Sequence, residues 1–221
     1  MSMCNLYSLT RPQASLRQLF KVEDDLTGNL PPLPGIYPDA MAPVIHLHGG
    51  RTAMGMMRWG FPPPPTAAAR PVTNIRNAGS PFWRPWFTPE NRCLVPATSF
   101  CEWTDKAPKV AHWFALNDER PVFAFAGIWR PWTGVRGTKA NPVVGEHHLF
   151  AFLTTSANAI VGPVHAKAMP VILREDEWTT WLTAPTPHAL RLQTPLPDSE
   201  LTIVATGVKE DPGVDAVQHT H

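Results

Sequence analysis

Apolar and polar positions along this chain form short runs, and long helical periodicity is rare. Short runs rich in apolar, β-branched and aromatic residues, bounded by turn-forming residues, are typical of strands. Such runs predict strands at residues 52–59, 92–104, 110–116, 122–129, 148–155, 168–173 and 201–205. Strands therefore dominate the predicted structure.

Helical spacing of apolar residues appears in three places. Residues 10–20 open with Thr-Arg-Pro, which predicts a helix start with Thr10 as N-cap, and leucine and phenylalanine then share one face. Acidic residues begin a second predicted helix at 175–182, and a short third helix is predicted at 187–192. The proline-rich stretch 29–44 reads as an irregular connection.

Many strands with few helices between them predict an α+β fold. We expect a mainly antiparallel, partly closed, β-barrel-like sheet with a few helices. The chain contains no internal repeat, so one domain over residues 1–206 is expected, followed by a polar, loose tail at 207–221.

Composition narrows the class of protein. The 26 prolines among 221 residues exclude a helical bundle or coiled coil, because proline breaks helix interiors, while 43% hydrophobic residues are enough for a core. Three cysteines without a CxxC pair predict neither a disulfide framework nor a zinc knuckle. Cys93 and Cys101 read as reduced core residues, which favours the cytoplasm. The sequence contains no long apolar span and no signal-peptide pattern at its N-terminus.

Charge is unevenly distributed although its total is only +1. Residues 51–92 contain six arginines and a single acid, Glu90, which gives +5 and leaves −4 for the remainder. The same segment carries six Trp and Phe residues. Arginines interleaved with aromatic rings suit a single-strand nucleic-acid groove, where cations follow phosphates and rings stack on bases. The alternative is a core segment whose aromatics point inward and whose arginines are solvated.

Cys4 is the first candidate for chemistry. A cysteine that becomes the first residue carries an α-amine, with a pKa near ~8, beside its thiol. The amine can form a Schiff base with an aldehyde, after which the thiol closes a five-membered thiazolidine. The alternative is a small apolar residue at the start of a strand.

Three further side chains are candidates for proton transfer or orientation. His165 follows a Gly-Pro turn, where an imidazole can titrate near neutral pH, although it could equally be a solvated loop residue. Glu102 is an acid inside an apolar strand, as suits a general acid or base, unless it lies on the wet face. Asn74 either orients a nucleophile or caps a turn.

Other chemistries have little support in the sequence. His147 with His148, and His46 with His48, are weak metal candidates because no third ligand is evident. No nucleophile-elbow motif, P-loop or dinucleotide fingerprint occurs. No metal or cofactor is therefore expected.

Seven short landmarks occur in order along residues 3–182: Met3-Cys4, Met57-Arg58-Trp59-Gly60, Thr73-Asn74-Ile75-Arg76-Asn77, Phe100-Cys101-Glu102-Trp103, Phe125-Ala126-Gly127-Ile128-Trp129, Thr154-Thr155, and His165 with Met169-Pro170-Val171-Ile172-Leu173. In this order they resemble the SRAP family (SOS-response-associated peptidase-like proteins), which are abasic-site sensors that crosslink covalently to single-stranded DNA. The resemblance implies a mixed fold around a β-barrel-like core with a basic DNA groove, in agreement with the strand-rich pattern.

The resemblance also implies roles for the four chemical candidates. Cys4, as the mature N-terminal residue, would form the thiazolidine with the ring-opened sugar aldehyde of an abasic site. Asn74 would hold the Cys4 amine and the opened sugar, and Glu102 would shuttle protons. His165 would act as acid or base on the sugar and assist strand cleavage or crosslink reversal.

Four residues of the arginine-rich segment are candidates for DNA binding. The resemblance implies that Arg76 grips the phosphate next to the lesion and that Trp59 packs on the nucleic acid. Arg58 and Arg84 are further candidates from the same segment. The expected partner is single-stranded DNA containing abasic sites, bound by a monomer without membrane association, in the cytoplasm or at the nucleoid.

The chain departs from the family pattern at its beginning. Cys4 is followed by Asn5-Leu6-Tyr7 rather than Gly-Arg, so a DNA contact from that arginine is absent or supplied elsewhere. Met1-Ser2 precede Met3, and removal of Met1 alone would leave the Cys4 nitrogen as an amide that cannot form a Schiff base. We therefore expect translation from Met3, with self-cleavage of the leader as the alternative. The usual acid after Asn-x-Arg is also replaced by Asn77-Ala78.

The leading hypothesis is a DNA-damage (SOS) response enzyme with abasic-site crosslinking and lyase activity, in which peptidase activity is limited to self-processing. One alternative is a thiol peptidase in which Cys4 attacks a peptide carbonyl with His165 as base. Another is a non-covalent single-strand DNA-binding module, whose binding would be salt-sensitive and indifferent to loss of Cys4.

Overall fold

Strands form where the sequence has apolar and β-branched runs, and they pair into two sheets. The computed structural model describes residues 4–63, 71–211 and 213, and it confirms the α+β class. The larger sheet contains β2 (Asp24–Asp25), β4 (Met41–His48), β5 (Arg51–Trp59), β6 (Asn74–Ile75), β7 (Arg92–Ala97), β10 (Phe123–Gly137), β11 (Pro142–Thr155), β12 (Met169–Pro170) and β13 (Ile172–Leu173). The smaller sheet has the order β14–β9–β8–β1–β3, with β1 Tyr7–Leu9, β3 Leu33–Ile36, β8 Ser99–Trp103, β9 Ala111–Ala115 and β14 Thr202–Thr206.

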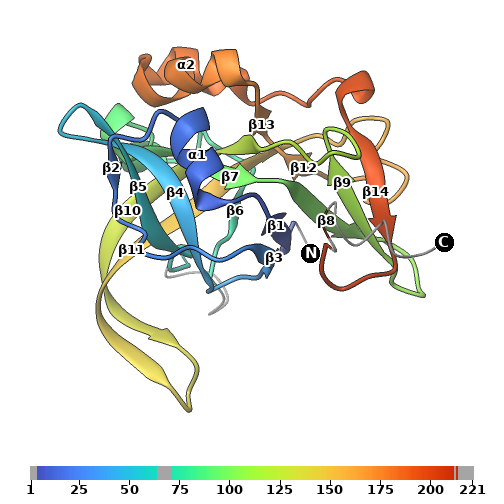
Figure 1. Cartoon of the computed structure of the whole chain (residues 1–221), viewed down its shortest axis with the longest axis horizontal. Coiled ribbons are helices and arrows are strands. Elements are labelled where there is room, and N and C mark those ends of the chain that lie inside the picture. The colour runs from blue at the N-terminus through green and yellow to red at the C-terminus, as the bar shows by residue number, and fades with distance from the viewer. Residues whose placement is uncertain (1–3, 64–70, 212, 214–221) are drawn as a thin grey trace.

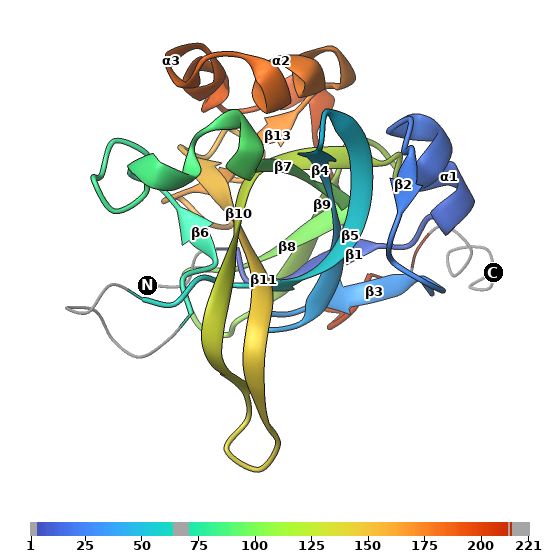
Figure 2. The same cartoon turned by 90° about the vertical axis from the view of Figure 1, so that its left-hand side faces the viewer.

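The larger sheet closes on itself into a barrel. Antiparallel pairs link β11 to β10, β10 to β7, β7 to β4 and β4 to β5, and β5 then pairs with β11 in parallel. In a ring of five strands the alternation of direction must fail once, and the parallel β5–β11 pair is that place. The barrel is visible end-on in Figure 2, where β10 and β11 extend beyond it as a long hairpin. Full closure removes the exposed sheet edges that invite aggregation.

The smaller sheet brings the N-terminal segment beside β8. Only Thr98 separates β7 from β8, so the chain passes directly from the barrel into the smaller sheet (Figure 1). Tyr7 pairs with Phe100, and the Cys101 N–H donates to the Leu6 carbonyl at 2.9 Å. Because the two strands run antiparallel, residues 4–6 lie alongside residues 101–103.

A cluster of aromatic rings joins the two sheets. The Tyr7 ring packs edge-on against Trp59 and Phe125, with centroid distances of 5.1 and 5.6 Å, and Phe125 packs on Phe152 at 4.6 Å. All four side chains are fully buried. Burial of rings of this size, together with edge-to-face geometry, is strongly stabilising. The position of β1, and hence of Cys4, is therefore fixed by the core.

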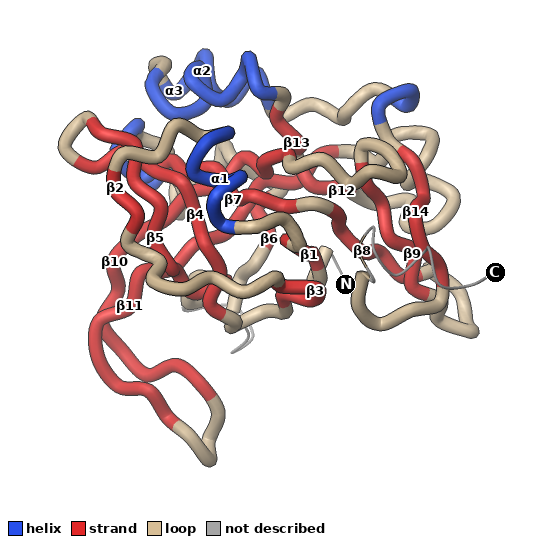
Figure 3. Tube along the Cα trace, viewed as in Figure 1, coloured by secondary structure: helices blue, strands red, loops and turns tan. Residues whose placement is uncertain are grey.

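Helices are few and short, as the secondary-structure colouring of Figure 3 makes plain. They are α1 (Gln13–Leu19), α2 (Trp178–Thr183) and α3 (Thr186–Ala189), with 3₁₀ turns at Arg84–Trp86, Pro89–Asn91, Glu175–Glu177, Leu190–Leu192 and Asp198–Glu200. Trp181 anchors α2 on the barrel, since its indole N–H donates to the carbonyls of Cys93 and Gly127. The predicted helices at 175–182 and 187–192 are confirmed in place.

Several sequence-based boundaries were wrong. The first helix begins after Pro12, which occupies the N-cap position expected for Thr10. The single strand expected at 92–104 is two strands in different sheets, and the connection expected at 29–44 contains β3 and the start of β4. Strands β10 and β11 are also much longer than the runs 122–129 and 148–155, because they continue as a hairpin.

Candidate active site

Cys4 lies at the start of the segment that runs beside β8. Its side chain is 1% exposed, and its thiol is within 3.6 Å of the Leu6 carbonyl oxygen and 3.9 Å of the Cys101 carbonyl oxygen. The thiol also interacts electrostatically with the Glu102 carboxyl. Burial, and after it the Glu102 charge, raises the pKa of the Cys4 thiol well above its ordinary value. The thiol is therefore neutral at neutral pH.

Asn74 holds the backbone of Cys4 from the barrel side. It lies in β6, which pairs in parallel with β11 opposite Phe152. The Asn74 side-chain N–H₂ donates to the Cys4 carbonyl and to the Thr73 hydroxyl, both at 2.8 Å. The Thr73 hydroxyl in turn donates to the side-chain oxygen of Asn5 at 3.2 Å. This small network fixes the first described residues of the chain, while the Asn74 side-chain oxygen is buried and has no partner among the described residues.

Glu102 points inward from β8, which excludes the wet-face alternative. Its side chain is 3% exposed, and one carboxyl oxygen, Oε1, has no hydrogen-bond partner among the described residues. Burial, and then the nearby charge of Asp105, raises the pKa of Glu102 well above its ordinary value, although the Cys4 thiol opposes the shift. A buried carboxyl with a raised pKa suits general acid–base chemistry.

His165 is buried, at 4% exposed, and not a solvated loop residue. Its Nδ1 lies 3.1 Å from the Asp105 carboxylate, whereas its Nε2 is buried without a partner among the described residues. Sequence reasoning missed Asp105. The only local signal is an acid three positions after Glu102, and its partner is 60 residues away in the chain.

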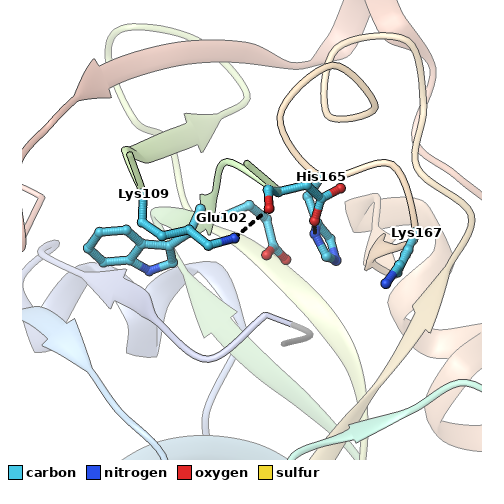
Figure 4. Close-up of a pocket in the computed structure, with 6 residues that line it drawn as sticks. Glu102, Lys109, His165 and Lys167 are labelled. Atoms are coloured by element: carbon cyan, nitrogen blue, oxygen red, sulfur yellow. Dashed lines mark hydrogen bonds and ion pairs between the residues drawn. The ribbon is translucent and has the colours of Figure 1, made fainter. Parts of the chain in front are cut away.

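Glu102, Asp105 and His165 share a cavity of about 490 Å³. It is lined by Glu102, Trp103, Asp105, Lys109, His165 and Lys167. Figure 4 shows Glu102 and His165 on neighbouring sides of the cavity, with Lys109 and Lys167 flanking them. A second cavity of about 390 Å³ touches Asn5 and Thr73 and also reaches Trp103, which therefore borders both. The structure thus brings Asn74 and Glu102 to Cys4 and lines one cavity with Glu102 and His165.

The arginines of residues 51–92 are in different environments. Arg76 and Arg84 are exposed and free to meet an anionic partner. Arg58 is partly buried, and its guanidinium donates to the Asp39 carbonyl at 2.7 Å and lies 3.5 Å from the Asp39 carboxylate. Arg51 pairs with Asp24 and Glu23, and Arg92 is buried. Arg70 lies outside the described residues. The local +5 therefore overstates the charge that this segment presents.

Trp59 does not occupy the surface position expected of it. Its side chain is 0% exposed and its indole N–H donates to the Thr73 carbonyl at 3.1 Å. The expectation that Trp59 packs on nucleic acid is therefore wrong, because the ring belongs to the core. Trp59 instead supports Thr73, which adjoins Asn74. Two exposed aromatic side chains line the cavities, Trp103 at 37% exposed and Tyr37 at 45% exposed.

The histidines named as weak metal candidates lie at the base of the hairpin. Their rings pack on aromatic side chains, His46 on Trp129 at 4.9 Å and His147 on Trp132 at 6.0 Å. Among residues 4–63, 71–211 and 213, no three His, Cys, Asp or Glu side chains form a group that could hold a metal. No helix in the same residues is long and apolar enough to cross a membrane.

The chain is similar in sequence to proteins that are named for abasic-site processing. The chain is 27% identical over 190 residues to the abasic site processing protein YoqW, from Bacillus subtilis and from Bacillus phage SPbeta, covering 81% of this chain and 80% of that protein. It is 26% identical over 190 residues to the abasic site processing protein YoaM of Bacillus subtilis, covering 81% and 79%.

Similar solved structures share the fold. A crystal structure of a protein from Bordetella bronchiseptica matches with a TM-score of 0.72 at 22% identity, covering 93% of this chain and all of that one. One from Bacteroides thetaiotaomicron matches with a TM-score of 0.74 at 22% identity, covering 90% of each chain. A sequence model of the SOS response associated peptidase (SRAP) family matches residues 3–210. The chain belongs to the SRAP family.

Proposed function

We propose that this protein processes abasic sites in single-stranded DNA by forming a covalent thiazolidine with Cys4. The observation that carries the proposal is the convergence of groups on this residue. The Cys4 carbonyl is held by Asn74 and its thiol faces Glu102, which shares a cavity with His165. Family membership and the names of the relatives support the same substrate.

The proposed reaction begins at the sugar of the abasic site. His165 transfers protons during ring opening, which exposes an aldehyde. The Cys4 amine adds to the aldehyde carbon, and loss of one water gives a Schiff base. Protonated Glu102 supplies the proton with which the hydroxyl leaves. The raised pKa of Glu102, caused first by burial, keeps this proton on the carboxyl to a higher pH than for an ordinary glutamate.

The thiol completes the crosslink. Loss of water with the Glu102 proton leaves the imine protonated and Glu102 as a carboxylate. The sulfur bonds to the imine carbon, the C=N π electrons go to nitrogen, and the thiol proton goes to the Glu102 carboxylate, which restores the acid. The product is a five-membered thiazolidine that retains both former nucleophiles. The raised pKa of the Cys4 thiol, due mainly to burial, supports this order, because a neutral thiol is a weak nucleophile and attacks once the Glu102 carboxylate formed in the first step can take its proton.

The reaction requires a free amine on Cys4. Residues 1–3 lie outside the described residues, so exposure of Cys4 is part of the proposal, through translation from Met3 and removal of that methionine. Self-cleavage of the leader is the alternative route, and it is the only peptidase activity proposed. Before the ring closes, the same Schiff base can release the 3′ phosphate by β-elimination, which is the proposed lyase activity.

DNA binding is proposed along the surface that adjoins the two cavities. Lys167, which lines the larger cavity, and the exposed Arg76 and Arg84 supply positive charge for phosphates. Partly exposed Trp103 offers a ring for stacking. We propose that a monomer binds in this way during the DNA-damage response, in the cytoplasm and at the nucleoid.

A thiol peptidase acting on other proteins has weaker support. Such an enzyme needs a thiolate paired with an imidazole. Among the described residues, the Cys4 thiol contacts two carbonyls and the Glu102 carboxyl, and the Nδ1 of His165 is bound to Asp105. A non-covalent DNA-binding module would not account for the burial of a thiol and a carboxyl next to each other at Cys4 and Glu102.

Crosslinking of a Met3-start protein to a single-stranded oligonucleotide with one abasic site tests the proposal. A heat-stable, shifted band on a denaturing gel is expected, and undamaged DNA of the same sequence should give none. Cys4→Ala should abolish the band, while the matched control Cys101→Ala, which removes a buried thiol from the neighbouring strand β8, should retain it. Equal crosslinking by Cys4→Ala would refute the role of Cys4.

A further inference from the structure

Asp105 ties the turn after β8 to the loop that carries His165. One oxygen of its carboxylate lies 3.1 Å from His165 Nδ1, and the other accepts the Ala166 N–H at 3.2 Å. The Asp105 N–H also donates to the Val164 carbonyl at 3.1 Å. Three bonds therefore join two segments 60 residues apart, and both oxygens of one carboxylate serve this purpose.

These contacts determine which imidazole nitrogen is available. A carboxylate can only accept a hydrogen bond, so neutral His165 carries its proton on Nδ1 and leaves Nε2 as a bare acceptor. Nε2 is buried, has no partner among the described residues, and belongs to the side chain that lines the cavity. Oε1 of Glu102, whose side chain lines the same cavity, is likewise buried without a partner among the described residues. Two unpaired buried polar atoms in one cavity point to a polar ligand there.

We propose that Asp105 is a positioning residue for this site. It holds His165 in the tautomer whose Nε2 lone pair is available to the substrate, and it balances the imidazolium charge when His165 takes up a proton. The inference rests on the proposed function for the identity of the substrate, although the state of His165 can be measured without DNA.

The charged groups around His165 are consistent with this role. Those that line the cavity are the acids Glu102 and Asp105 and the bases Lys109 and Lys167. Lys109 is occupied by the turn itself, because its ammonium donates to the carbonyls of Thr104 and Asp105 at 2.7 and 2.8 Å. It therefore braces the turn that presents the Asp105 carboxylate. Among the described residues, Asp105 supplies the carboxylate that is hydrogen-bonded to His165.

Asp105 also acts on Glu102. After burial, its charge is the next cause that raises the pKa of Glu102. Loss of the charge should therefore lower the pKa of Glu102. This effect follows from the charge of Asp105 alone, so the role of Asp105 toward His165 is tested by the imidazole tautomer and by the rate in the His165→Ala background.

The first test is the tautomer of His165, read by ¹⁵N–¹H correlation spectroscopy of the imidazoles, with His165→Asn used to assign the signal. In the unaltered protein at a pH where His165 is neutral, the proton is expected on Nδ1. In Asp105→Asn a mixture of tautomers is expected, because an amide can either accept or donate. The control Asp118→Asn removes the same charge from an exposed turn outside the cavity and should change nothing. Identical His165 signals in all three proteins would overturn the proposal.

The second test measures single-turnover crosslinking rates. Asp105→Asn should slow the reaction about 10-fold or more, as loss of a group that orients a histidine commonly does, and Asp105→Glu should recover part of the rate. In a His165→Ala background, at a pH low enough for Glu102 to stay protonated in every variant, the same change should have little further effect. Equal slowing in both backgrounds would contradict action through His165. In the pH profile of the crosslinking rate, the transition caused by ionisation of Glu102 should also move to lower pH in Asp105→Asn.

The two proposals can fail separately. If the unaltered protein forms no crosslink but Asp105 controls the His165 tautomer, the proposed function fails and the positioning role stands. If crosslinking requires Cys4 but neither the tautomer nor the rate responds to Asp105, only the positioning role fails.

Discussion

At the scale of single residues, Cys4 carries the proposed nucleophiles although its side chain is buried. Its carbonyl is fixed by Asn74 and its thiol is kept neutral by burial beside Glu102. In the proposed reaction the α-amine, once exposed, is therefore the first nucleophile, and the thiol then attacks the carbon that the amine has bound. Holding reactants in attack geometry lowers the entropic part of the barrier.

Glu102→Gln is expected to raise stability at neutral pH while slowing crosslinking about 100-fold or more. The carboxyl ionises near its ordinary pKa of 4.5 in the unfolded chain and well above that value in the folded protein. Between these two pKa values the folded state holds the extra proton, so the stabilising contribution of Glu102 is complete below the unfolded pKa. It is lost as pH rises through the folded pKa. The glutamine variant has no such loss.

Urea denaturation at a series of pH values from 4 to 9 (about one unit apart) measures this difference. The unfolding free energy of the unaltered protein should fall relative to that of the variant as the pH rises. Parallel pH curves for the two proteins would show that Glu102 ionises normally, and would remove the acid role assigned to it.

Asn74→Asp is expected to cost about 1–3 kcal/mol of stability and to slow crosslinking about 10-fold or more. The change replaces an N–H₂ that donates to the Cys4 carbonyl at 2.8 Å with an oxygen that repels it. Asn77→Asp is the matched control, because Asn77 is exposed in the same segment and should lie within about 0.5 kcal/mol of the unaltered protein. Thermal denaturation and the gel assay measure both quantities, and equal behaviour of the two variants would argue against a specific role for Asn74.

At the scale of elements, local pattern located most strands and helices but not their ends or partners. Prolines at 34 and 43 made residues 29–44 look irregular, yet Pro34 lies in β3, an edge strand that tolerates a missing donor. Pro43 lies in β4 where β7 does not pair with it, since that pairing involves Ile45 and His46. The hairpin beyond Trp129 has polar and glycine residues that carry no strand signal, and it is held by its cross-strand ladder to β11.

The candidate site was predictable only in part. Cys4, Asn74, Glu102 and His165 follow from short ordered motifs, and the structure brings them to adjoining positions, although their roles remain predictions. Asp105 could not be inferred, because its importance depends on a loop 60 residues away. The burial of Trp59 was equally hidden, since an aromatic residue beside an arginine has the same local pattern on a surface and in a core.

Trp181→Phe is expected to lower the unfolding free energy by about 1–3 kcal/mol by weakening the contact of α2 with the barrel. The indole N–H donates to the carbonyls of Cys93 and Gly127 at 2.9 and 3.2 Å, and phenylalanine leaves them without that donor. Trp132→Phe, on the partly exposed hairpin, is the control and should have little effect. Chemical denaturation compares the two, and similar losses would mean that ring size, not the N–H, anchors α2.

At the scale of the whole molecule, the end of the described chain returns to the two strands that build the site. The Asp211 carboxylate, which is fully buried, pairs with Arg120 at 3.0 Å and accepts hydrogen bonds from the hydroxyls of Ser8 and Ser99. Ser8 lies in β1 and Ser99 in β8, the strands that position Cys4 and Glu102. Asp211 therefore belongs to the buried structure, although it lies beyond the domain end expected at residue 206.

Asp211→Ala is expected to destabilise the protein by about 3–5 kcal/mol, because it leaves the buried Arg120 guanidinium without its partner. The neighbouring Glu210 is exposed, so Glu210→Ala should change stability by less than about 0.5 kcal/mol. Chemical denaturation measures both changes. Equal stability of the two variants would indicate that residues after 206 are a dispensable tail.

The most direct test of the whole account is the identity of the residue that carries the DNA. The Met3-start protein is crosslinked to an abasic oligonucleotide, digested with nuclease and protease, and analysed by tandem mass spectrometry. The account predicts that the sugar remnant lies on the peptide that begins with Cys4, attached to both its nitrogen and its sulfur with loss of one water. A remnant on a lysine, or on an internal cysteine while the Cys4 peptide remains unmodified, would contradict it.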